Sequence, residues 1–196
     1  MREQPRADAV AQFLRANGAH CLPHANGRTL LEHLLGTRDI LGAWNAPQWL
    51  RDAGALHSVY ATDVYLRQLI SFSRRDEVRT VTSARAERLA YLFGVVRRVP
   101  FFATLARLAP DFPEQLPLAA RCPDGSTTAT LARGESSFLV LLHMANELEQ
   151  ERGPAGESRP WSARVQRLAA LLDADVAIRP QWFFNSCSGI RNRQFR

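Results

Sequence analysis

The chain has 196 residues, a length typical of one domain with room for a full hydrophobic core. Apolar residues make up 46% and charged residues 22%, as in an ordinary soluble globular protein. All 25 basic residues are arginine and the net charge is +6, but no zinc-finger or RNA-recognition signature accompanies them. Basic charge alone supports only non-specific electrostatic binding, so we expect no specific nucleic-acid partner.

The cysteines and the apolar segments indicate where the protein resides. The three cysteines, Cys21, Cys122 and Cys187, are isolated from one another, which argues against a disulfide framework and fits a reducing compartment. No apolar run is long enough to span a bilayer, and no apolar segment follows the N-terminal Met1. We therefore expect a cytoplasmic, single-domain protein over 1–196 that has no membrane partner.

Helical patterns fill the first hundred residues. A short amphipathic helix over 6–16 stops at Asn17-Gly18, a usual C-terminal signal. The next helix starts at Thr29, which forms a capping-box pattern with Glu32. Apolar periodicity predicts further helices over about 48–70, 84–98 and 101–109. The first of these is followed by a polar stretch over 71–83, which we expect to be a loop or a frayed helix.

The second half begins with the longest irregular segment, 110–132, which contains several prolines and at most one strand-like pair. Irregular segments of this length are often functional lids. The strongly apolar stretch 135–151 predicts a helix buried in the centre of a bundle. A last amphipathic helix, about 161–173, precedes an arginine-rich tail that completes a C-terminal region over 160–196. These patterns predict an all-α fold.

Two histidines stand 24 residues apart on the apolar sides of successive expected helices. His33 lies in Thr-Leu-Leu-Glu-His-Leu-Leu-Gly-Thr, and His57 lies in Ala-Gly-Ala-Leu-His-Ser-Val-Tyr-Ala-Thr. A buried imidazole is costly unless it is hydrogen-bonded or bound to a ligand. Two hypotheses remain open: a structural pair bonded to each other, to a backbone carbonyl or to Tyr60, and a functional pair that binds a metal or acts as a general base.

These motifs, with Ala-Glu-Arg-Leu-Ala at 86–90 and Ala-Asn-Glu-Leu-Glu-Gln at 145–150, resemble an uncharacterised family of bacterial HD-like domains. The resemblance covers about 18–150, and a more distant one is to the hydrolase domain of RelA/SpoT proteins. It implies a single-domain HD-like helical bundle in which histidines and carboxylates from several helices hold a divalent cation that activates water. The segment from His143 to Leu148 looks like the distal metal-binding motif, with Asn146 at its aspartate position.

The chain departs from the HD pattern at its anionic positions. Ser58 stands where the second histidine is normally followed by aspartate, and Asn146 replaces the distal aspartate. Hard cations prefer anionic oxygen, so Mg²⁺ would bind poorly there. We expect metal candidates His33, His57, His143 and Asn146, catalytic candidates His33, His57, Ser58 and Tyr60, and either one divalent metal (Mn, Fe or Zn) or none.

Three functions follow from these residues. The first is an HD-like hydrolase of a phosphorylated small molecule or nucleotide with an atypical or degraded metal site. The second is a tailoring enzyme of small-molecule metabolism, either iron-dependent and oxygenase-like or a metal-free acid/base catalyst. The third is a non-catalytic binding domain on an HD scaffold. All three take a small molecule as the partner, and the sequence decides neither the substrate nor the oligomeric state.

Overall fold

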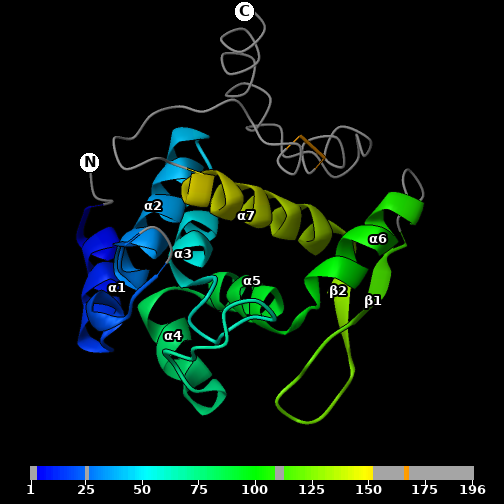
Figure 1. Cartoon of the computed structure of the whole chain (residues 1–196), viewed down its shortest axis with the longest axis horizontal. Helices are drawn as coiled ribbons and strands as arrows, with labels where there is room; N and C mark the ends of the chain where they lie inside the picture. The colour runs from blue at the N-terminus through cyan, green and yellow to red at the C-terminus, as the bar shows by residue number, and fades with distance from the viewer. Residues whose placement is uncertain (1–3, 25–26, 109–112, 152–165, 168–196) are drawn as a thin grey trace, which may run out of the picture.

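The computed structural model describes residues 4–24, 27–108, 113–151 and 166–167 (Figure 1). The expected helix over 161–173 lies outside the described residues except at 166–167. The arginine-rich tail lies outside them altogether. In the described part, buried apolar side chains form two clusters, and the site considered below lies among the helices that carry them.

The N-terminal half is helical, as predicted. Helix α1 spans Gln4–Ala16, the 3-10 turn η1 spans Ala19–Cys21, and α2 spans Leu30–Ala43. The expected capping box at the start of α2 is present: the Thr29 hydroxyl accepts from the Glu32 backbone N–H, and the Glu32 carboxylate accepts from the Thr29 N–H at 2.7 Å. Two orphan donors of the first helical turn are thereby satisfied.

Helix α3 spans Gln48–Leu56 and packs closely against α2. A side chain at Gly54 would place its Cβ 2.6 Å from Leu41 Cδ1, so glycine permits this close approach. The predicted helix over 48–70 is too long, because the chain turns after Leu56. The carbonyl of Val59 accepts the N–H of Ile70, and Ala61 adopts a left-handed φ of 68°, which no α-helix accommodates.

The expected polar stretch 71–83 is more ordered than a loop. It contains η3 (Phe72–Arg74) and α4 (Arg75–Val81), followed by α5 (Ala84–Val95) and α6 (Arg98–Leu108). Glu87 of α5 is fully buried and joins these segments through ion pairs with two arginines of α4. A charge buried among partners in this way anchors α4 to the bundle.

The expectation of an all-α fold is wrong, because the segment 110–132 contains an antiparallel hairpin. Strand β1 (Gln115–Ala119) pairs with β2 (Thr128–Ala132) in a two-stranded sheet. In each strand the second and fourth residues are buried and their neighbours are exposed, except for the partly buried Ala119, which is the alternation of a half-buried strand. The apolar residues of both strands cover one side of the core, so burial specifies the hairpin despite its prolines.

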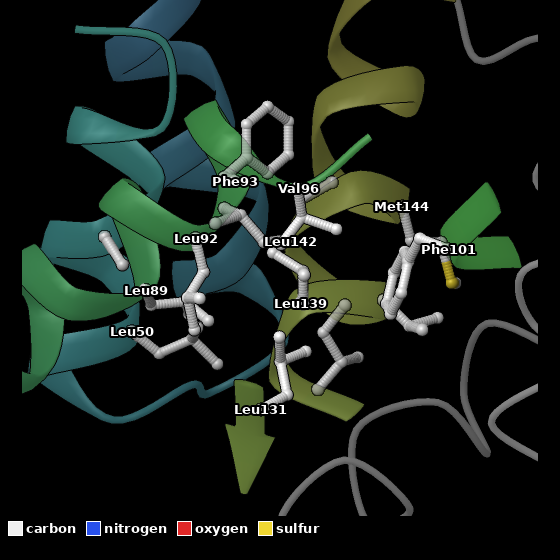
Figure 2. Packing of buried hydrophobic residues seen from close by; sticks show 14 of the residues in the cluster. Leu50, Leu89, Leu92, Phe93, Val96, Phe101, Leu131, Leu139, Leu142 and Met144 are labelled. Carbon is white, nitrogen blue, oxygen red and sulfur yellow. The ribbon is translucent and has the colours of Figure 1, made fainter. Parts of the chain in front are cut away.

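Helix α7 (Arg133–Glu151) crosses over α2, α3 and α5, and it contributes side chains to the larger core. Figure 2 shows Leu139, Leu142 and Met144 of α7 facing Leu92 of α5 and Phe101 of α6. This confirms the expected buried helix over 135–151. None of the helices in the part of the chain that the structure describes has the length and apolar character needed to cross a bilayer.

Candidate functional site

The two histidines that the sequence singles out meet in the interior. His33 projects from the middle of α2, and His57 follows the last residue of α3. Both side chains are fully buried. Their Nε2 atoms are 3.0 Å apart and their ring planes are inclined by 76°. Because α2 packs closely on α3, two histidines that are 24 residues apart in the sequence come within hydrogen-bonding distance.

The outer nitrogen of each ring also has a partner. His33 Nδ1 contacts the Glu149 carboxylate of α7, and His57 Nδ1 donates to the Gly54 carbonyl at 2.8 Å. Arg28 forms an ion pair with the same carboxylate, whose side chain is 2% exposed. Hydrogen bonds of this kind fix the tautomer and the orientation of an imidazole.

The contacts of the two histidine rings constrain how many protons the rings carry. The three contacts, Glu149 to His33, His33 to His57 and His57 to the Gly54 carbonyl, need three protons if each is a hydrogen bond. Neither a carboxylate nor a carbonyl supplies one, and two neutral imidazoles supply only two. With an ionised Glu149, the pair therefore needs one additional proton for all three contacts to be hydrogen bonds.

The environment of His57 disfavours a charge on that ring. Burial first, and then the neighbouring His33, hold the pKa of His57 well below its ordinary value of 6.5. Hydrogen bonds to Gly54 and to the Asn146 side chain oppose this shift without reversing it. The charged form of His57 is therefore disfavoured, and of the two rings it is His33 that contacts the Glu149 carboxylate.

A second layer covers His33. The ring of His24 stacks on that of His33 with centroids 4.0 Å apart, and the edge of Tyr65 meets His24. Both ring nitrogens of His24, the Tyr65 hydroxyl and Arg28 Nε are buried atoms with no hydrogen-bond partner among the described residues. Such atoms are normally satisfied by water or by a ligand. Burial, the largest cause, lowers the pKa of His24 to about 4.

Gly36 of α2 determines how closely Glu149 can approach. A Cβ built at this position would lie 2.7 Å from Glu149 Oε1 and 2.9 Å from its Cγ. A glycine in a helix costs about 1 kcal/mol relative to alanine, so its presence needs a packing reason. That reason is the space which the carboxylate occupies between Arg28 and His33.

Some expected site residues lie at this centre and others do not. Asn146 is buried one turn before Glu149, and its carboxamide oxygen accepts from Gln150 Nε2 at 3.3 Å. Tyr60 points elsewhere, because its hydroxyl donates to Glu87 at 3.1 Å. His143 stacks on Phe93, which in turn meets the edge of His57, so an aromatic ring contacts both histidines. Ser58 is buried beside His57 in the chain, and its backbone carbonyl accepts from the Ala61 N–H.

The metal centre of an HD hydrolase does not fit these residues. The described residues include no group of three or more histidine, cysteine, aspartate or glutamate side chains that could hold a metal ion. Glu149 contacts the nitrogen of His33 that faces away from His57, and it is already paired with Arg28. The carboxylate thus orients an imidazole and is not aimed at the gap between the two Nε2 atoms, where hard cations would need anionic oxygen.

Glu149, the carboxylate of this centre, was not predicted from the sequence, because the family resemblance assigns the distal position to Asn146. Glu149 follows Asn146 by three residues, so both lie on one face of α7. Its partner Arg28 is 121 residues away in the sequence, which no local pattern can reveal. The signal in the sequence was that Glu149 follows Asn146, a predicted site residue, by about one turn of the same helix.

Comparison with known proteins gives one match. Residues 13–98 match the family model described as Domain of unknown function (DUF6817). The matched segment runs from α1 to the first residue of α6 and includes His33 and His57, whereas Asn146 and Glu149 lie outside it. No curated protein and no solved structure matches the chain.

Proposed function

We propose that the chain is a hydrolase of a phosphorylated small molecule or nucleotide, and that it works by metal-independent acid–base chemistry at His33 and His57. The observation that carries this proposal is the contact of one imidazole with a carboxylate at Nδ1 and with a second imidazole at Nε2. A carboxylate that orients a histidine is the recurring arrangement by which hydrolases activate a hydroxyl group or water.

The shared proton makes the pair both an acid and a base. In this proposal the bound substrate and its water separate the two Nε2 atoms. His57 Nε2 then accepts a proton from the attacking water, whose oxygen bonds to phosphorus as the bond to the leaving oxygen breaks, and His33 Nε2–H donates its proton to that leaving oxygen. The proton on His57 passes back to His33 when the Nε2 contact re-forms, so the pair ends each turnover as it began. Proton transfers of this kind contribute about 10²–10⁴ to a rate.

The layer above His33 supports binding of an anion. Arg28 is about one quarter exposed, and its Nε is a buried donor with no partner among the described residues. The unpartnered atoms of His24 and Tyr65 adjoin it. A phosphate offers acceptor oxygens to such donors, and arginine suits it through planar geometry. In this proposal the substrate displaces the His24 ring from its stack on His33.

The test is phosphate release from a panel of phosphate monoesters and nucleotides, with the full chain assayed in excess chelator. We expect turnover of at least one member and its loss in His33→Gln. Glu149→Gln should lower kcat by about 10²-fold or more, because the ring loses its orienting charge. Glu77→Gln, which changes a surface carboxylate, is the matched control and should leave kcat unchanged. Activity that disappears with the chelator and returns with added metal would contradict the proposal.

A second function is favoured by one observation, the complete burial of both imidazoles. A non-catalytic binding domain would keep them as a structural pair beneath a ligand held by His24, Arg28 and Tyr65. In that case, phosphorylated compounds would raise the melting temperature without being consumed. The same variants distinguish the two functions, since His33→Gln would then leave ligand binding largely intact.

A further inference from the structure

A cavity of about 240 Å³ lies where α3, α5 and β2 meet the first turn of α7. It is separate from the histidine centre: Trp49 precedes His57 by eight residues along α3, a helical rise of about 12 Å. Its apolar walls are Trp49, Leu89 and Phe138. The volume lies below the roughly 300–1,000 Å³ of drug-sized pockets, so it suits a single ring that carries a small substituent.

One wall of the cavity is formed by an exposed arginine, Arg85. The guanidinium of Arg85 lies over Trp49, 3.7 Å from the ring centroid, and 5.1 Å from the centroid of Phe138. Stacking uses the face of a guanidinium and leaves its in-plane N–H groups available. Within the described ranges no carboxylate pairs with Arg85. Stacking on Trp49 therefore fixes the orientation of the Arg85 guanidinium, and its N–H groups lie at the edge of the aromatic rings that line the cavity.

The one carboxylate lining the cavity is already neutralised. Glu135 accepts from Arg88 Nε at 3.1 Å and from the Ala132 backbone N–H at 2.9 Å. Gly134 and Glu135 line the cavity from the first turn of α7, the positive end of the helix dipole. The uncompensated charge facing the cavity is thus positive, and it comes from Arg85.

The perpendicular rings of Trp49 and Phe138, with centroids 4.8 Å apart, complete the recognition surface. We propose that this cavity binds a small aromatic anion, with its ring against Trp49 and Phe138 and its carboxylate or phosphate group on Arg85. This inference is independent of the proposed hydrolase activity. It assigns a second small-molecule site to the opposite end of α3.

Calorimetric titration of the full chain tests the site with four probes: benzoate, phenyl phosphate, the neutral benzyl alcohol and inorganic phosphate. We expect at least one aryl anion to bind, and to bind roughly ten- to a hundredfold more tightly than benzyl alcohol, because charged hydrogen bonds supply that difference. Inorganic phosphate, which lacks the ring, should bind more weakly than phenyl phosphate. The comparison of benzoate with phenyl phosphate identifies which anionic group the site prefers.

Variants assign the binding to this cavity. Arg85→Gln, which removes the charge but keeps a planar polar side chain, should weaken binding of the aryl anion at least about tenfold. Arg107→Ala removes the same charge from the exposed surface of α6 and should leave the affinity for benzoate unchanged, as should His33→Gln at the other centre. No binding of either aryl anion at millimolar concentration would overturn the proposal. So would equal affinity for benzyl alcohol, or equal affinities of Arg85→Gln and Arg107→Ala with both variants folded.

Discussion

Replacing Glu149 by alanine tests the buried centre most severely. The carboxylate is 2% exposed and serves both Arg28 and His33, so its removal leaves a buried histidine nitrogen and an arginine without their acceptor. Breaking a buried ion pair from one side costs about 3–5 kcal/mol. The Arg28 side chain is 26% exposed and can be partly solvated, which places the expected loss near the lower end of that range, at about 3 kcal/mol.

The assay is urea unfolding of the full chain at pH 7, followed by far-ultraviolet circular dichroism. Domains of this kind have about 5–15 kcal/mol of stability, so the variant should remain folded and measurable. The double variant with Arg28→Ala should recover part of the loss, because the arginine is then no longer left without its acceptor, although His33 still lacks the carboxylate. Glu77→Ala, which also removes a paired but surface carboxylate, is the control. If Glu149→Ala were no more destabilising than this control, Glu149 would not anchor the centre.

Three further predictions concern the same helices. Gly36→Ala should destabilise by up to about 2 kcal/mol in urea unfolding, because the clash of the new Cβ with Glu149 costs about 1–3 kcal/mol and the gain in helix propensity is about 1 kcal/mol. Thr29→Ala should cost about 1 kcal/mol through loss of the α2 cap, and equal melting temperatures would contradict that role. Stability should fall as the pH drops below 6.5, because His24 and His57 have depressed folded-state pKa values and the unfolded chain takes up protons first. For His24 the fall should level off below about pH 4, and a stability independent of pH between 4 and 6.5 would refute both shifts.

Local signals in the sequence predict the first half of the fold well. The capping box at Thr29 was predictable because its hydrogen bonds join residues three positions apart. The end of α3 was not, because the apolar period continues through Tyr60 while the chain is already turned by a hydrogen bond between Val59 and Ile70. That hydrogen bond closes a loop, and the apolar periodicity of the sequence gives no sign that the chain turns there.

The hairpin and the carboxylate were missed for a related reason. Leu116 and Leu131 pair across a loop, and the alternation within each five-residue strand is too short to outweigh the neighbouring prolines. Glu149 acquires its role only when α7 packs against α2 and brings it to His33. The histidine pair was predictable because adjacent helices carry it, whereas the residue that gives the pair its charge comes from the far end of the chain.

Nitrogen-15 NMR of the histidine rings tests the central claim, that the pair holds one additional proton. The protein is labelled at histidine, and the resonances are assigned through His33→Gln and His57→Gln. If the pair shares an additional proton, His33 and His57 together carry three ring N–H groups at neutral pH. His33 should be protonated at both nitrogens, and His57 should be protonated at Nδ1 alone. Two neutral rings at neutral pH, or two rings that titrate independently near pH 6.5, would contradict the claim and return both histidines to separate structural roles.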